Sequence, residues 1–305
     1  MAFYKIGNVI RKRRIDLNLT QEELSFGICS VSTLSKIENG ERYPNKKNFD
    51  ALMQRLGGSV DMYNTFVSEN DFLIHEKKFF IRQNILRKKY NDSYLLLKEL
   101  KSLVENEQEK LHTQFILYIE TYLYSIKNGY TEKILKKMLD AIKITIPNFT
   151  ISNISNYILT FDEIFIISNI ANVYGHLNKC NYAIDILIKL KEFLESEQIN
   201  TEEIIKTYPL VLHSLSDWLK VSRRYLECID ICDRGIQFCC EISHTMYLSD
   251  FYFFKGYCML NIENSLYIQQ IYDNFKLAYF SAISIGDIYK ANYYFDFFLS
   301  IGYLI

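Results

Sequence analysis

Cysteine and histidine are the residues of this chain best suited to ligate a metal or to act as nucleophiles, and their spacing favours neither role. Cys228 and Cys232 lie four apart on a predicted helix, a spacing that suits two zinc ligands, but no second pair follows at a suitable distance. We therefore expect buried, reduced thiols and no metal or other cofactor. The seven cysteines are Cys29, Cys180, Cys228, Cys232, Cys239, Cys240 and Cys258, and the five histidines are His75, His112, His176, His213 and His244.

Motifs of catalysis and of membrane insertion are missing from the sequence. It contains no HExxH, no GxSxG and no glycine-rich phosphate loop, so we expect no enzyme activity. The first fourteen residues, MAFYKIGNVIRKRR, carry charges where a signal peptide would be apolar, and no run of 18 apolar residues follows. These features predict a cytoplasmic protein without a membrane partner.

Charge is distributed unevenly along the 305 residues. Residues 1–60 contain ten lysines and arginines against six acids, a net charge of +4, while the remainder of the chain carries −5. A small basic segment on a larger acidic body fits contact with nucleic acid through the basic segment alone.

The basic segment has the helix signals of a compact head. Thr20 followed by Glu23 forms a predicted capping box, which starts a helix at about 21–26. A short turn over 27–30 leads to a helix over VSTLSKIENG, which Gly40 ends in the left-handed conformation. A preceding helix over 3–17 and a following one over about 46–56 complete the segment. Two short helices joined by a tight turn suit insertion of the second into a DNA major groove.

The string LTQEELSFGICSVSTLSKIENGERYP resembles the Cro/C1-type (XRE) helix-turn-helix, over residues 5–60. The form with Cys29 in the turn is similar to the PlcR/Rgg (RRNPP) group of peptide-responsive regulators. The resemblance implies that the helix starting at Val31 reads base edges in double-stranded DNA, and that Val31 packs on a thymine methyl group because it cannot donate a hydrogen bond. The DNA-binding residues that the resemblance implies are Gln21, Val31, Ser32, Ser35, Lys36, Asn39 and Arg42.

The remainder of the chain is predicted to be helical and repetitive. Three prolines and eleven glycines are too few for a β-rich chain of this length. Residues 170–187 align with 215–232 at an offset of 45, each unit reading as a helix, a polar turn and a helix. A further pair is expected at 251–260 and 274–283, and an earlier one at 93–100 and 114–126. The fold class is therefore all-α, with a five-helix head followed by a helical repeat.

These units resemble degenerate tetratricopeptide repeats, which implies a right-handed superhelix with a concave surface lined by the first helix of each pair. Asparagine and tyrosine side chains on these helices suit an extended peptide, because they can hydrogen-bond its backbone; the same aromatic residues could instead fill the core. The peptide-binding candidates are Asn169, Asn172, Tyr174, Ser214, Asp217, Trp218, Tyr252, Lys255 and Tyr257.

We thus expect a helix-turn-helix domain over 1–66 and a repeat domain over 67–305 that senses a ligand and forms a homodimer. The segment 60–81 contains no proline or glycine, so a helical connection is predicted. One hypothesis is a transcription regulator whose repeat domain binds a short signalling peptide. The alternative is a regulator whose repeat domain binds another protein; a third, an enzyme with an appended DNA-binding domain, has no motif in its favour.

Overall fold

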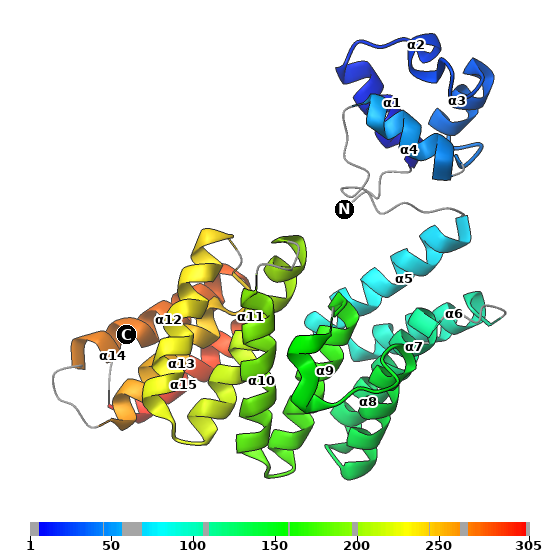
Figure 1. The fold of residues 1–305 in the computed structure, drawn as a ribbon. Coiled ribbons are helices and arrows are strands. Elements are labelled where there is room, and N and C mark those ends of the chain that lie inside the picture. The colour runs from blue at the N-terminus through cyan, green and yellow to red at the C-terminus, as the bar shows by residue number, and fades with distance from the viewer. Residues whose placement is uncertain are drawn as a thin grey trace. The chain divides into compact units, whose positions relative to one another are not determined.

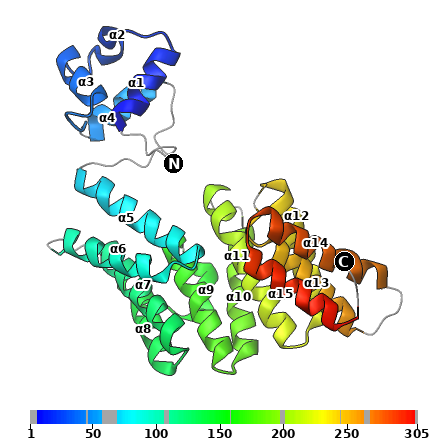
Figure 2. The same ribbon diagram turned by 180° about the vertical axis from the view of Figure 1, so that it is seen from behind.

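The computed structural model describes residues 6–44, 46–56, 69–105, 110–157, 159–196, 201–243, 245–262 and 268–302. Within these ranges the chain is helical and contains no strand (Figures 1 and 2), which confirms the all-α prediction. No helix of the described part is long and apolar enough to cross a membrane. The chain divides into two compact units, Met1–Glu107 and Gln108–Ile305.

Four helices form the head. They are α1 (Ile6–Asp16), α2 (Gln21–Ser25), α3 (Val31–Glu38) and α4 (Lys46–Arg55). Their apolar faces meet in one core, as the helical spacing predicts. The predicted fifth helix lies outside the described residues. The core consists of Ile10, Leu24, Leu34, Ile37, Phe49, Leu52 and Leu56, each less than 5% exposed.

Two further helices of the first unit form an antiparallel pair, α5 (Glu69–Leu86) and α6 (Tyr90–Leu103). Lys88 takes a left-handed conformation, with φ +58°, at the turn between them. The predicted helical connection over 60–81 is thus present from Glu69 onward, and its earlier part lies outside the described residues.

The second unit is a row of helices in which each packs against the next in sequence (Figures 1 and 2). Helix α9 also packs against α11, and α11 against α13, so the first helices of successive pairs lie in one layer. The elements are α7 (Lys110–Asn128), α8 (Glu132–Thr145), the 3₁₀ helix η2 (Ile151–Asn156), α9 (Phe161–His176), α10 (Cys180–Glu195), α11 (Thr201–Val221), α12 (Tyr225–Glu241), α13 (Leu248–Asn261), α14 (Ile268–Ser284) and α15 (Ile288–Ser300).

The offset of 45 residues recurs in the backbone of the turns. Asn178, between α9 and α10, and Arg223, between α11 and α12, are both left-handed, with φ +62° and +58°. The amide after each turn closes back on the first helix, from Lys179 to the Tyr174 carbonyl at 3.0 Å and from Arg224 to the Leu219 carbonyl at 2.9 Å. The two pairs are therefore true structural repeats.

The predicted pairing at the start of the repeat is wrong. Residues 114–126 belong to α7, which packs against α8, while residues 93–100 belong to α6, which packs against α5. The turn at Gly129, with φ +78°, joins α7 to α8 directly. The sequence pattern marked both helices as amphipathic but could not show which neighbour each one covers.

Candidate nucleic-acid interface and ligand-binding layer

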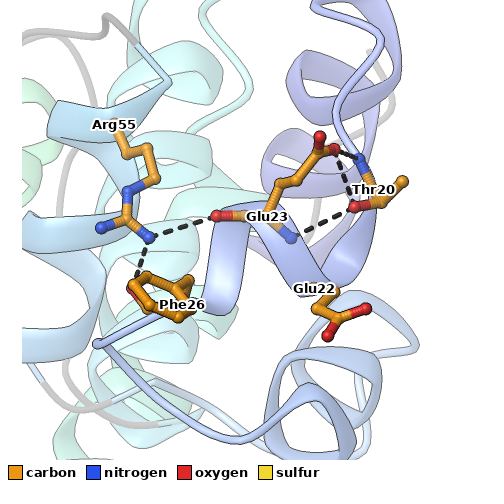
Figure 3. A pocket seen from close by; sticks show the side chains of 5 residues that line it. All are labelled: Thr20, Glu22, Glu23, Phe26 and Arg55. Atoms are coloured by element: carbon orange, nitrogen blue, oxygen red, sulfur yellow. Dashed lines mark hydrogen bonds between the residues drawn. The ribbon is translucent and has the colours of Figure 1, made fainter.

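Helix α2 is held at both ends by side chains. The Thr20 hydroxyl accepts from the Glu23 amide at 3.1 Å, and the Glu23 carboxylate accepts from the Thr20 amide at 2.7 Å, which confirms the capping box. At the other end, the Arg55 guanidinium donates to the carbonyls of Glu23 at 3.2 Å and Phe26 at 2.5 Å (Figure 3). It also donates to the Leu24 carbonyl at 3.0 Å. Thr20, Glu23, Phe26 and Arg55 line a shallow surface hollow together with Glu22. These bonds fix where α2 ends and where the turn begins.

Helix α3 presents one polar face to solvent. Ser30 caps it by accepting from the Thr33 amide at 3.1 Å, while Leu34 and Ile37 enter the core. Gly40 follows with φ +75°, as predicted. The backbone N–H groups at the start of this helix can bind an anionic phosphate.

Most of the predicted DNA-binding side chains are accessible. Ser35 is half-buried, and Gln21 is half-buried with its amide nitrogen 2.8 Å from a Glu38 carboxylate oxygen. One amide hydrogen of Gln21 thus bonds to Glu38 within the head, and the other can bond to an acceptor on DNA. The exposed members are Val31, Ser32, Lys36, Asn39 and Arg42.

A buried ion pair locks α1 and α3 together. The Arg14 guanidinium contacts both carboxylate oxygens of Glu38, at 2.6 and 2.9 Å, and donates to the Leu19 carbonyl at 2.8 Å. Burial alone would raise the pKa of Glu38, which is 1% exposed, but the hydrogen bonds from Arg14 and Gln21 outweigh it, so this pKa is lowered. The sequence carried a signal for this pair, because Glu38 lies one turn after the buried Leu34 and an acid there needs a partner.

In the repeat, two asparagines of α9 bridge to the first helices on either side. The Asn169 amide nitrogen donates to the Tyr118 hydroxyl of α7 at 3.0 Å and to the Phe165 carbonyl at 2.9 Å. The Asn172 amide oxygen accepts from the Trp218 indole of α11 at 2.9 Å. Contacts of this kind link five helices, which together form the first-helix layer: α7, α9, α11, α13 and α15.

Trp218 is the only tryptophan of the chain and fills the junction of α9 and α11. It is 7% exposed, and a Cβ atom added to Gly175 would lie 2.3 Å from its ring. His176 meets the indole edge at 5.1 Å between ring centres and stacks on Tyr130 at 4.1 Å. Burial lowers the pKa of His176, against an opposing effect of Asp217.

The other predicted peptide-binding residues lie on first helices, as expected, but several have partners within the repeat. Tyr174 packs edge-on against Tyr182 of α10, at 4.7 Å between ring centres. Ser214 is buried, Asp217 pairs with Lys220 at 2.8 Å, and Lys255 pairs with Asp233 of α12. Tyr252 and Tyr257 are half-buried on α13. The structure therefore brings together Asn169, Asn172 and Trp218 but not the whole predicted set.

The sequence analysis missed a polar cluster centred on Asp250 of α13. Its carboxylate accepts from Lys290 at 2.7 Å and from Tyr294 at 2.6 Å, both on α15, and lies 3.6 Å from the His213 imidazole of α11. Burial would raise the pKa of Asp250, but these neighbours lower it. The pKa of His213 is lowered, mainly by burial, although its side chain remains 26% exposed. The cluster ties three first helices together.

The buried thiols of the repeat make no metal site. Cys228 and Cys232 of α12 have their sulfurs 3.9 Å apart, and both are 0% exposed, as predicted for this pair. Cys240 is exposed, against the prediction that the cysteines are buried. Among the described residues, no three histidine, cysteine or acidic side chains come close enough to bind a metal ion.

The head is similar to a known family of domains. Residues 10–62 match the helix-turn-helix family model. No curated protein sequence matches the chain. The match includes α2, α3 and the turn between them, and it does not extend to the repeat.

Solved structures resemble the chain over nearly its whole length. One is Bacillus thuringiensis PlcR in complex with the peptide PapR7 and DNA, with 22% identity, a TM-score of 0.67 and coverage of 95% of this chain and 97% of that one. Another is ComR from S. thermophilus with DNA and its signalling peptide ComS, with 15% identity, a TM-score of 0.60 and coverage of 98% and 100%. A third is the SHP pheromone receptor Rgg2 of Streptococcus dysgalactiae, with 12% identity, a TM-score of 0.56 and coverage of 97% and 99%. At these identities the likeness establishes the fold, a helix-turn-helix followed by a helical repeat.

Proposed function

We propose that this chain is a sequence-specific DNA-binding transcription regulator whose repeat domain binds a short peptide. The exposed polar face of α3, set on a head that matches the helix-turn-helix model, supports the DNA-binding part. Lys36 and Arg42 supply cations for phosphate, and Ser32 and Ser35 supply hydroxyls for base edges. Gln21, Val31 and Asn39 complete the proposed surface.

The observation that favours a peptide is the orientation of the two asparagine amides on α9. The Asn172 amide oxygen accepts a hydrogen bond from the Trp218 indole. The Asn172 amide nitrogen makes no hydrogen bond within the described part of the chain. Asn169 has the opposite arrangement, because its nitrogen is engaged by Tyr118 and Phe165. Asn172 thus offers a donor and Asn169 an acceptor, one turn apart on one helix face. An extended peptide backbone carries both complementary groups, which must be paired when buried.

PlcR and ComR, which share this fold, were each solved with a peptide and DNA. For this chain we propose the same pair of ligands, with the repeat domain acting as a tetratricopeptide-like sensor and the protein working as a homodimer in the cytoplasm. The candidate residues on α11 and α13 that already pair within the repeat, such as Asp217 and Lys255, would have to exchange partners if they contact the peptide.

Trp218 provides the readout for the experiment. Synthetic peptides encoded by short reading frames beside the gene are titrated into the full chain, while tryptophan fluorescence and binding to a selected DNA duplex are recorded. Because Trp218 is the only tryptophan and bonds to Asn172, a bound peptide should change its emission. We expect the change in Trp218 emission to saturate as peptide is added, and the affinity for the duplex to change over the same range of peptide concentration.

Asn172→Asp separates peptide binding from folding. The aspartate keeps an oxygen for the Trp218 indole but loses the amide donor, so the fold should persist while peptide affinity falls about ten- to a hundredfold. Asn156→Asp, at an exposed position of η2, is the matched control and should bind peptide as the wild type does. Equal peptide affinity in Asn172→Asp, Asn172→Ala and the control would contradict the proposed site.

A further inference from the structure

A second polar site lies in the first-helix layer, beyond the two asparagines assigned to the peptide backbone. It has His213 at its centre, and we name it the His213 site. The rings of Tyr247 and Phe254 flank the imidazole, with their centres 4.9 and 5.5 Å from that of His213. The charged members of the site come from three first helices, Asp217 and Lys220 from α11, Asp250 from α13 and Lys290 from α15.

The His213 site can be reached from solvent. The side chains of His213, Lys220 and Lys290 are 26, 19 and 22% exposed. The helices α10, α12 and α14 pack against one side of the first-helix layer. The accessible side of the site is therefore the side on which Asn169 and Asn172 are half-buried. One extended ligand on that side can contact both the asparagines and the His213 site.

The hydrogen-bonding capacity that the His213 site leaves unused consists mainly of donors. The His213 ring nitrogen lies 3.6 Å from the Asp250 carboxylate, which is too far for a hydrogen bond, and the ring makes none within the described part of the chain. Lys290 donates one hydrogen bond to Asp250, so two of its three N–H groups remain. The acids are already paired, Asp250 with Lys290 and Tyr294, and Asp217 with Lys220 at 2.8 Å. A ligand that complements the site must therefore bring an acceptor.

We propose that the His213 site binds a carboxylate of the peptide, which is either its C-terminus or an acidic side chain. A carboxylate can accept from the His213 ring and from Lys290 at the same time, and such charge-assisted bonds are stronger than bonds between neutral groups. The inference rests on the proposed function and deepens it, because it names a chemical group that the peptide must carry. The amides of Asn169 and Asn172 pair with any peptide backbone, whereas the His213 site selects among peptides.

The separation of the asparagines from the His213 site sets a length for the peptide. The helices α9, α11 and α13 are successive members of the first-helix layer, and packed helices lie about 8–10 Å apart. Two such steps span about 16–20 Å, which about five or six extended residues cover at about 3.3–3.6 Å each. A peptide of about seven residues thus reaches from Asn172 to the His213 site with its carboxylate.

Retention of synthetic peptides by the full chain tests the carboxylate. Three pools of N-acetylated random peptides of about seven residues are used. The first pool lacks aspartate and glutamate and ends in a carboxylate, the second is identical but ends in a carboxamide, and the third ends in a carboxamide but includes both acids. Gel filtration isolates the bound peptides, and mass spectrometry counts and sequences them. The wild type should retain the first pool about tenfold more than the second, or should select members of the third pool that carry an acid.

Substitutions of His213 separate its hydrogen bond from its packing. His213→Phe keeps a ring between Tyr247 and Phe254 but removes the donor, so the preference for a carboxylate should fall to about two- to threefold, with Lys290 still in place. His213→Gln keeps a donor and should retain most of the preference. The matched control is His112→Phe, at a half-buried position of α7, which should behave as the wild type does. The preference compares pools on the same protein, so a loss of folded protein cancels.

The pH dependence is a readout that a purely structural role of His213 would not change. Burial lowers the pKa of His213 from its ordinary value, against the attraction of nearby acids, so the ring is mainly neutral near pH 7 in the free protein. A carboxylate beside the ring would raise this pKa, so binding would take up a proton. The preference for the carboxylate should therefore grow as the pH falls from about 8 to about 6 in the wild type, but not in His213→Phe. The titratable groups around the ring are Asp217 and Lys220 of α11, Tyr247 and Asp250 at the start of α13, and Lys290 and Tyr294 of α15.

The outcomes separate this inference from the proposed function. A preference that is reduced in His213→Phe but kept in His213→Gln and His112→Phe supports the site, and the pool that is retained tells a terminal carboxylate from a side chain. Equal retention of carboxylates and carboxamides, a full preference in His213→Phe, or an equal loss in His112→Phe would overturn the site and leave peptide binding intact. Retention of no peptide from any pool would overturn the proposed peptide function, and the site with it.

Discussion

The head and the repeat use polar side chains in opposite ways. In the head, Arg14 and Glu38 form a buried ion pair to which Gln21 of α2 also bonds. The other side chains proposed to touch DNA, such as Val31, Ser32 and Lys36, lie exposed on α3 and apart from that pair. In the repeat, the asparagines proposed to touch a ligand are themselves the links between helices. The head therefore presents a fixed surface, whereas a ligand that binds the repeat at these asparagines would act on the bonds that hold neighbouring helices together.

This difference assigns separate roles to the two regions. A surface that is independent of its supporting network can change specificity without loss of fold. If the asparagines bind a ligand as proposed, the ligand would shift the helices relative to each other, because each bond that it replaced or tightened joins two helices. Asp250, which links α11, α13 and α15, extends the same arrangement to the end of the row.

The largest effect is expected from removal of the buried acid in the head. Glu38→Ala leaves the Arg14 guanidinium, which is 13% exposed, without its carboxylate partner. Loss of one partner of a buried ion pair costs about 3–5 kcal/mol. The full-length Glu38→Ala chain is titrated with chemical denaturant while duplex binding is measured as the readout. Its head should unfold at a much lower denaturant concentration than that of the wild type.

The pH dependence of this difference has a definite sign. Because the folded-state pKa of Glu38 is lowered, its stabilisation is fully present above the unfolded-state pKa and is lost as pH falls through the folded-state value. The gap between wild type and Glu38→Ala should thus shrink in acid. Glu41→Ala, at an exposed position, is the control and should change stability by less than about 0.5 kcal/mol. Equal stability of the two variants at neutral pH would show that the head does not depend on the network.

A smaller effect is expected at the junction of α9 and α11. Gly175→Ala would place a methyl group 2.3 Å from the Trp218 ring, so the indole must move and its bond to Asn172 must lengthen. Overpacking of this kind costs about 1–3 kcal/mol. Thermal unfolding should show a lower midpoint, and the emission of Trp218 should shift in the absence of peptide.

The matched control for this substitution is another helical glycine of the first-helix layer. At Gly256 of α13 an added Cβ atom would lie 3.2 Å from Asn274 and Phe275, a contact that a small adjustment relieves. Alanine there gains about 1 kcal/mol of helix propensity, which offsets the crowding. A Gly175→Ala protein as stable as Gly256→Ala would show that the α9–α11 junction is loosely packed and would weaken the proposed coupling.

The sequence predicted the head better than the repeat for a physical reason. The capping box, the turn and the glycine that ends α3 depend on residues within four positions of each other, so local spacing reveals them. Asn172 and Trp218 are 46 residues apart and His213 and Asp250 are 37 apart, and no local pattern shows which side chains meet across repeats. Because local patterns do not reveal contacts between distant residues, the sequence paired α7 with the wrong helix. For the same reason, Glu38 was recognised as part of the helix-turn-helix motif but not as one half of an ion pair.

The smallest predicted effect tests whether the head surface is as independent as the comparison implies. Lys36 is exposed on α3 and makes no ion pair in the described part of the chain. Lys36→Ala should leave the unfolding midpoint unchanged and remove about one phosphate contact from a selected duplex, which lowers the slope of log affinity against log salt by about 1. Between 50 and 200 mM salt, the affinity ratio should therefore change about three- to fourfold relative to the wild type. Lys133→Ala, at an exposed position of α8, should keep the wild-type slope. An unchanged slope in Lys36→Ala would mean that α3 does not face the DNA backbone at this residue, whereas a lowered unfolding midpoint would mean that the surface and its support are not separate.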